Sequence, residues 1–266
     1  MKKSQKSATS SFNRRTIRFS PAPRIRVVAE QNAGALSSAI GIFVGCGSRR
    51  ESTAFHGVTH LAEHLFFKGT SRYSAEQISS LIERHGGEIN AFTDREVTAF
   101  HTWIPVDQTE LALELLFEML FDSLFDPKEF DREKVVVLQE LRSYADSPDE
   151  EFSDSLLEVA LNNHPLGRRI AGFPKAVKNL SHKKVTNYIE EQFLRSKIVV
   201  SIVSPLKEEK IRELVRKTLK KSIKWKWGNL VHKGARRFPE TTPLVTDLSQ
   251  RSEMRPFAAE QVQFGF

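Results

Sequence analysis

The sequence predicts an α+β fold with a mostly antiparallel sheet and helices packed on one side of it. Two β-branched runs open the chain and are joined by the turn Asn32-Ala33-Gly34, which is typical of a hairpin. Amphipathic helical patterns and short strand-like runs then follow in mixed order. A doubly wound parallel fold would repeat strand and helix in strict alternation, so this order favours the antiparallel arrangement.

Each predicted strand is a short run rich in β-branched or aromatic residues. We expect strands at residues 24–30, 37–44, 88–92, 97–104 and 198–203. Each predicted helix shows apolar residues at a period of about 3.6. We expect helices at residues 56–67, 74–85, 107–121, 126–144, 151–161, 181–193 and 208–219. Ser74 and Gln77 form a predicted capping box at the start of the second helix, and Gly86 ends that helix.

The composition is that of a folded globular protein. The chain has 266 residues, of which 39% are hydrophobic and 27% charged. No run approaches the roughly 18 apolar residues that cross a membrane, so we expect no membrane insertion. The single cysteine, Cys46, excludes an intrachain disulfide and a zinc site built from cysteines. A bound metal would therefore need histidine and carboxylate ligands.

Charge and local composition divide the chain. The formal net charge is +7, but lysine and arginine are spread along the sequence, so we expect no nucleic-acid partner.

Local composition predicts the domain boundaries. We expect a disordered basic lead-in at residues 1–22, for which a transit peptide is the alternative. One domain is expected at 23–225 and a linker at 226–258. Residues 259–266 alternate apolar and polar side chains like a strand, but no partner strand follows them.

The segment His60-Leu61-Ala62-Glu63-His64 lies inside a predicted helix. Residues four apart share one helical face, so both imidazoles can reach one ion, and the glutamate points close to the same spot. A catalytic zinc site needs a third protein ligand and an open position for water. Glu133 and Glu140 lie two turns apart on one face of helix 126–144, so either could be the ligand and the other a supporting acid.

Ordinary structural roles compete with these interpretations. The two histidines could be a half-exposed helix pair, and the two glutamates could be solvated. The remaining candidates, His56, His85 and His101, are expected to be surface or loop-packing residues rather than metal ligands.

Four motifs, in order, resemble the insulinase/pitrilysin family of inverted zincins. They are HGVTHLAEHLFFKGT, GGEINAFTDREVTAF, REKVVVLQELRSYADSP and NNHPLGRRIAGFP. The most similar branch is that of the mitochondrial processing peptidase and its bacterial relatives. The resemblance runs from about Arg24 to about Leu219 and implies the metallohydrolase fold shared by LuxS and the processing peptidases.

The resemblance also implies a role for each residue of the site. The metal ligands of one Zn²⁺ per chain would be His60, His64 and Glu140. Glu63 would be the general base that takes a proton from the zinc-bound water and returns it to the leaving amine. Glu133 would support the ligands. The substrate backbone would pair with an edge strand at Asn90 and Ala91.

We therefore expect a zinc metalloendopeptidase domain that hydrolyses extended peptides or small proteins. Family members generally continue into a second similar domain, and residues 259–266 look like its truncated first strand. A second half-domain or a homo-oligomer is thus the expected partner. A catalytically weak or silent subunit that acts as a scaffold is the alternative. The similarity points to a bacterial cytoplasm, with a mitochondrial matrix as the alternative if the basic N-terminus is a transit peptide.

Overall fold

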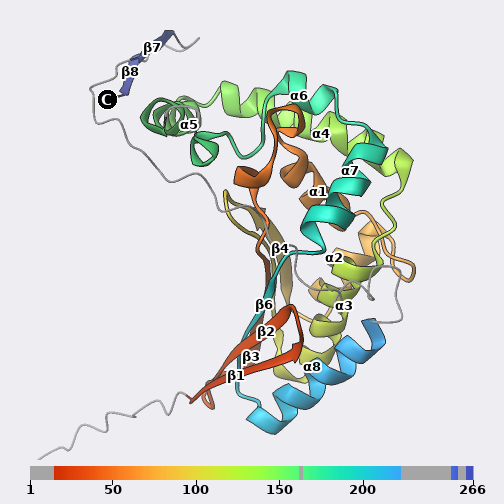
Figure 1. The fold of residues 1–266 in the computed structure, drawn as a ribbon. Coiled ribbons are helices and arrows are strands. Elements are labelled where there is room, and N and C mark those ends of the chain that lie inside the picture. The colour runs from red at the N-terminus through yellow and green to blue at the C-terminus, as the bar shows by residue number, and fades with distance from the viewer. Residues whose placement is uncertain (1–14, 162–163, 223–252, 257–261, 266) are drawn as a thin grey trace, which may run out of the picture.

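The computed structural model describes residues 15–161, 164–222, 253–256 and 262–265, and Figure 1 shows its elements. A six-stranded sheet has the order β1-β2-β6-β3-β5-β4. The strands are β1 (Arg15–Ala22), β2 (Ile25–Gln31), β3 (Ser37–Val44), β4 (Glu88–Thr93), β5 (Thr98–Pro105) and β6 (Ile198–Ser204). Only the β2–β6 pair is parallel, so the predicted α+β fold with a mostly antiparallel sheet is confirmed.

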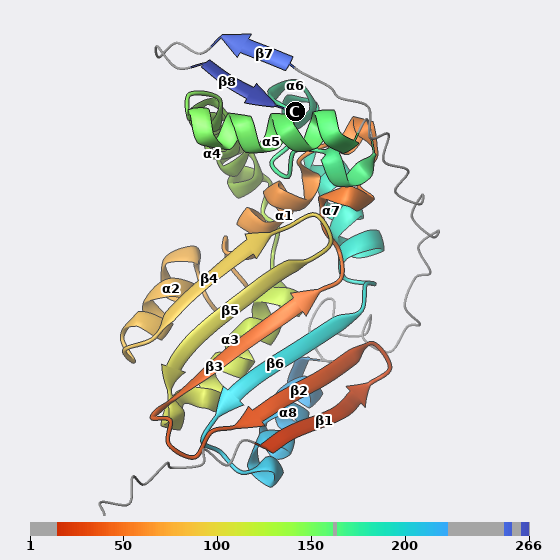
Figure 2. The same ribbon diagram turned by 90° about the vertical axis from the view of Figure 1, so that its left-hand side faces the viewer.

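The helices occupy two places around the sheet. Three of them cover one face, namely α2 (Ala75–Glu83), α3 (Thr109–Asp122) and α8 (Glu208–Ser222) (Figures 1 and 2). The others gather at one end, namely α1 (Val58–Phe66), α4 (Pro127–Ala145), α5 (Pro148–Leu161), α6 (Pro174–Lys178) and α7 (His182–Tyr188). The last of these continues into a π-helical turn at Ile189–Phe193.

The core lies between the sheet and the helices on its covered face. Strand side chains alternate between the two faces, so Ile42 and Val200 are completely buried, as is Phe117 of α3. Burying each such side chain stabilises the fold by about 1.5–3 kcal/mol. Residues of the opposite face stay open, and Trp103 and Val203 are 49% and 37% exposed.

The predicted opening hairpin is wrong. Strands β2 and β3 do not pair, because β6 lies between them and bonds to both. Ile198, Val200 and Ile202 of β6 are buried, and a central position lets the strand hide this face and satisfy both of its backbone edges. The turn signal at residues 32–34 is therefore a real turn, but it connects two strands that are not neighbours.

The predicted disordered lead-in at 1–22 is also wrong for residues 15–22. These residues form β1, which pairs antiparallel with β2. Ile17 is only 2% exposed, whereas Arg18 beside it is exposed. The basic composition concealed this alternation, which is the signature of a half-buried strand. Residues 1–14 lie outside the described residues.

The C-terminal expectations are partly outside the described residues. Of the predicted linker at 226–258, only Glu253–Pro256 is described, and it forms strand β7. Strand β8 (Val262–Gly265) pairs antiparallel with it, so the expected strand without a partner is wrong. The partner precedes it in the chain, inside the segment that composition marked as a linker.

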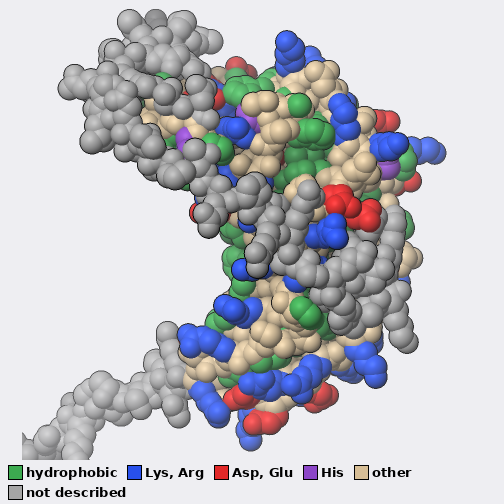
Figure 3. All heavy atoms as spheres, in the orientation of Figure 1, with side chains coloured by type: hydrophobic (Ala, Val, Ile, Leu, Met, Phe, Trp, Pro, Cys, Tyr) green, Lys and Arg blue, Asp and Glu red, His purple; other side chains and the backbone are tan. Residues whose placement is uncertain are grey.

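Basic side chains gather at one end of the molecule, and many of them form ion pairs. Figure 3 shows many basic side chains around the end of the molecule that carries β1 and α8. Several of them pair with acids: Arg15 and Arg212 contact Glu208 at 3.0 and 2.7 Å, and Lys217 contacts Glu110 at 2.6 Å. Among the described residues, no helix has the length and apolar character needed to cross a membrane.

Candidate metal centre

Helices α1 and α4 bring the predicted ligands together. The apolar residues of α1, among them Leu61 and Leu65, are fully buried in the core, which leaves His60 and His64 on the face toward α4. Asp126 caps the start of α4 by accepting the Lys128 N–H at 2.7 Å, and the helix then runs for 19 residues. This length carries Glu140 up to the two imidazoles.

The three predicted ligands face one another across a small gap. Glu140 Oε1 lies 3.7 Å from His60 Nε2, and Glu140 Oε2 lies 3.6 Å from His64 Nε2. These separations are too long for hydrogen bonds. The donor atoms of all three residues lie within 4.8 Å of one another. Zinc ligands 2.0–2.1 Å from the ion at tetrahedral angles lie about 3.3 Å apart, so an inward shift of these side chains would let them bind one zinc ion. Within the described part of the chain, this is the one cluster of three residues with suitable donors in reach of each other.

Glu133 holds the ring of His64. The His64 Nδ1–H donates to Glu133 Oε2 at 3.1 Å, and Lys68 Nζ contacts the other carboxylate oxygen at 2.9 Å. Burial raises the pKa of Glu133, but the hydrogen bonds from His64 and Lys68 outweigh burial and leave that pKa below its ordinary value. An ionised Glu133 fixes the proton on Nδ1, which keeps the Nε2 lone pair toward Glu140.

His60 is neutral in this environment. Burial, together with the neighbouring His64, lowers the pKa of His60 to about 4. A neutral imidazole is the form that binds a metal. The His60 Nδ1 atom is buried and has no hydrogen-bond partner among the described residues, so this ring is held by packing rather than by a second carboxylate.

Glu63 lies beside the ligands and is partly buried. Burial raises its pKa, and a hydrogen bond from Thr93 Oγ1 opposes that effect. A carboxylate whose pKa is raised is a stronger base near neutral pH. The position and the pKa direction both suit a proton acceptor.

Sequence reasoning missed two residues that touch the site. Thr93, at the end of β4, donates a hydrogen bond to Glu63, and the Tyr144 hydroxyl donates a hydrogen bond to Glu140 Oε1. Burial and the adjacent Glu140 raise the pKa of Tyr144, so it stays a donor. Tyr144 lies four positions after Glu140 on one helix, and that spacing could have revealed it. The contact from Thr93 crosses from a strand to a helix, and no local pattern predicts it.

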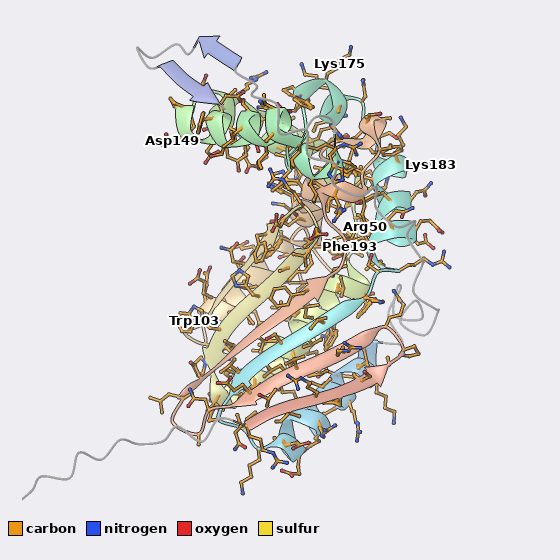
Figure 4. The ribbon with its side chains drawn as sticks, turned by 60° about the vertical axis from the view of Figure 1, so that its left-hand side comes forward. Arg50, Trp103, Asp149, Lys175, Lys183 and Phe193 are labelled. Atoms are coloured by element: carbon orange, nitrogen blue, oxygen red, sulfur yellow. The ribbon has the colours of Figure 1, made fainter. Side chains whose placement is uncertain are left out.

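A cavity of about 580 Å³ opens onto the cluster. Figure 4 shows Asp149 on α5, beyond the end of the sheet. The described residues that line the cavity carry several carboxylates and include no lysine or arginine; they are His60, Glu63, His64, Ala91, Phe92, Thr93, Glu140, Tyr144, Asp149, Glu150, Ser153, Asp154, Ile170 and Ala171. Because the charged side chains in this lining are acidic, the cavity favours positively charged groups.

The predicted substrate strand is an edge strand. Among the described strands, β4 pairs only with β5, so none of them covers its other edge, and Ala91 lines the cavity. Asn90 is exposed and does not line the cavity. Its Oδ1 accepts the Ala91 N–H at 2.8 Å, which satisfies one backbone donor of the strand. A peptide that uses this donor must first displace the Asn90 side chain.

His56, His85 and His101 are not part of the cluster. His56 is 8% exposed and stacks on Phe173 with ring centroids 5.8 Å apart. His85 Nδ1 bonds the Leu81 carbonyl at 2.8 Å, and the exposed His101 lies on β5.

Two histidines on one helix and a carboxylate from a second helix face one another, and the half-buried Glu63 lies beside them. This is the donor set of a mononuclear zinc hydrolase. The chain belongs to the insulinase family (peptidase family M16), whose model matches residues 26–173. This confirms the family that the sequence motifs predict.

The curated relatives have names of the same kind. The chain is 34% identical over 190 residues to an uncharacterized zinc protease, YmxG, of Bacillus subtilis, covering 71% of this chain and 46% of that protein. It is 33% identical over 197 residues to a probable mitochondrial-processing peptidase subunit beta of Arabidopsis thaliana, covering 74% and 37%. The chain thus spans about half the length, or less, of these two relatives. The names support a peptidase function and zinc dependence.

Solved structures share the fold. A protease from Helicobacter pylori superposes with a TM-score of 0.77 at 22% identity, over 86% of this chain and 54% of that one. Pitrilysin superposes with a TM-score of 0.76 at 21% identity, over 90% and 25%. At these identities, the likeness concerns the fold.

Proposed function

We propose that this chain is the metal-bearing part of a zinc metalloendopeptidase. One Zn²⁺ would be held by His60, His64 and Glu140, with Glu63 as the general base. The observation that carries the proposal is the pair of distances, 3.7 and 3.6 Å, between the Glu140 oxygens and the two imidazole Nε2 atoms. Three protein ligands would leave a coordination position on the zinc for water, as catalysis requires.

The protein groups have separate tasks in peptide hydrolysis. Zn²⁺, when bound, polarises the scissile carbonyl and acidifies a water molecule. Glu63 accepts the proton of that water and later delivers it to the leaving amine. Thr93 fixes the carboxylate of Glu63 in direction, and Tyr144 does the same for Glu140. Glu133 and Lys68 hold His64 in the correct tautomer.

The cavity and the edge strand support a peptide substrate. An extended segment would lie along β4 and be recognised by backbone hydrogen bonds, with loose sequence preference. The carboxylates of Asp149 and Glu150 would favour a basic side chain near the scissile bond.

The assembly and location of the whole protein are part of the proposal. A second half-domain or a second copy of the chain would close over the cavity and exclude water. A silent scaffold subunit is the alternative function, and it would bind zinc without cleaving peptides. The proposed location is the bacterial cytoplasm, with the mitochondrial matrix as the alternative.

Metal content and peptide cleavage, measured together, test the function. The samples are the wild type, Glu63→Gln and the control Glu83→Gln, which changes an exposed acid on α2. We expect about one zinc in all three and cleavage of a quenched basic peptide by the wild type and the control only. Zinc without cleavage in the wild type would favour the scaffold, and a wild type without zinc would contradict the metal site.

A further inference from the structure

The metal-bearing helix is capped by a carboxylate from outside the helix. α1 begins after Gly57, whose φ is +85° and which has no side chain to cap the helix. Glu51 supplies the missing acceptors: its Oε2 accepts the Gly57 N–H and its Oε1 the Thr59 N–H, each at 2.8 Å. Glu51 is only 3% exposed. A buried carboxylate at this end also interacts favourably with the helix dipole.

Glu51 and the start of α1 also contact residues 168–172, which form one wall of the catalytic cavity. The Arg168 guanidinium donates a hydrogen bond to the Glu51 backbone carbonyl. Residues 168–172 then pass against the start of α1 so closely that a Cβ on Gly57 would lie 2.4 Å from the Ala171 oxygen. Gly172 has φ +79°, and a Cβ there would lie 2.6 Å from the Gly57 nitrogen. Ala171 lines the cavity, so this wall and α1 form one packed unit.

A hydrogen bond from α7 also fixes the first turn of α1. Thr59 Oγ1 bonds Tyr188 Oη at 2.7 Å, and this hydroxyl also bonds Cys46 Sγ at 3.3 Å. Thr59 immediately precedes His60. Figure 4 shows Arg50 where the upper helices meet the end of the sheet. Arg50 interacts electrostatically with Cys46 and Tyr188 of this network.

We propose that Glu51 is a positioning residue that sets the placement of α1, and thereby of His60, Glu63 and His64, against Glu140 on α4. The inference rests on the proposed function, because it concerns the same zinc centre. Its physical basis is the tolerance of metal coordination: ligand distances must hold within about 0.2 Å, whereas a helix without its cap frays through its first turn. His60 lies in that first turn.

The loss of a purely stabilising cap would have a different effect. It would lower the stability of the whole domain and leave the metal geometry of the folded molecules unchanged. The decisive readouts are therefore the zinc affinity of the folded chain and the visible absorption spectrum of the Co²⁺-substituted chain, which reports ligand geometry.

The test compares Glu51→Gln with Glu118→Gln in the full chain at pH 8. Glu118 is a matched control because it is completely buried, accepts from Arg72 and Thr70, and lies on α3. We expect Glu51→Gln to lower the zinc affinity roughly tenfold and to change the Co²⁺ spectrum. Glu118→Gln should reduce the unfolding temperature but keep the zinc affinity and spectrum of the wild type.

The second variant, Glu51→Asp, keeps the charge but is one methylene too short to reach both N–H groups. We expect its zinc affinity to lie between those of the wild type and Glu51→Gln, and it serves as the test if Glu51→Gln does not fold. Folded Glu51 variants with the affinity and spectrum of the wild type would overturn the positioning role while leaving the zinc site intact. A wild type that binds no zinc would overturn the proposed function and this inference with it.

Discussion

The Thr93 hydroxyl donates a hydrogen bond to the carboxylate of Glu63. The edge strand β4 and the metal-bearing helix α1 therefore meet at the proposed base. A hydrogen bond to a charged group contributes about 1.5–3 kcal/mol. We expect Thr93→Val to lower kcat by roughly 10- to 100-fold with zinc content unchanged. Thr93→Ser keeps the hydroxyl and should restore most of the rate. Equal rates for the valine and serine variants would show that the hydrogen bond has no catalytic role.

Glu133 should control zinc affinity without being a ligand. Removing its charge frees the His64 ring to rotate or change tautomer, and changes of this kind cost about 10- to 100-fold in metal affinity. Competition with a chelator of known affinity measures this for Glu133→Gln. Glu129→Gln, an acid on the same helix that pairs with Arg132, is the control and should bind zinc like the wild type. A Glu133→Gln chain with unchanged affinity would contradict the supporting role.

Zinc removal should lower the melting temperature. A ligand present at 100 times its Kd stabilises the folded state by about 2.7 kcal/mol. We expect a chelator to reduce the Tm of the wild type and of the control His85→Ala. His85 is an exposed histidine that forms a hydrogen bond with the Leu81 carbonyl of α2. His64→Ala should show no such shift. A chelator effect of the same size in His64→Ala would place the metal elsewhere.

The stability of the metal-free chain should carry a pH-dependent contribution from Glu51. Burial raises the pKa of Glu51 to about 7 from 4.5, against the opposing hydrogen bonds from Thr59 and Gly57. Between these two pH values the folded state holds a proton that the unfolded chain has lost. This contribution therefore decreases as the pH rises through that window, by about 3 kcal/mol at most.

Other charged groups around Glu51 must be separated from this effect. Arg168, Arg50, Cys46 and Tyr188 interact electrostatically with the carboxylate or with its immediate partners. Urea unfolding of the wild type and of Glu51→Gln at several pH values isolates the contribution as a difference. We expect the wild type to lose stability relative to the variant from pH 5 to pH 7. Parallel curves would mean that Glu51 has an ordinary pKa.

Strand β1 should contribute measurably to stability. Ile17 is 2% exposed, and replacing a buried isoleucine with alanine costs about 2–5 kcal/mol. We expect Ile17→Ala to reduce the free energy of unfolding by an amount in this range. Thr16→Ala, at the exposed neighbouring position, should change it by less than about 0.5 kcal/mol. If both variants match the wild type, residues 15–22 do not form the strand.

The sequence alone determined the features that depend on a few neighbouring residues. The capping box of Ser74 and Gln77 is present, and the acid and proline at 126–127 begin α4. The i, i+4 spacing of His60 and His64 places both imidazoles on one face of α1 because any helix imposes that geometry. The order of the elements was enough to predict an antiparallel α+β fold, since it excluded strict alternation.

Only the tertiary structure decided which distant groups meet. The residues alone left Glu133 and Glu140 as equal candidates, and the packing of α4 against α1 places Glu140 on the Nε2 atoms and Glu133 on His64 Nδ1. The insertion of β6 between β2 and β3 likewise depends on how the whole sheet buries its apolar face. Propensities and caps act over one or two turns, whereas these contacts form only when the core is packed, so no local pattern contains them.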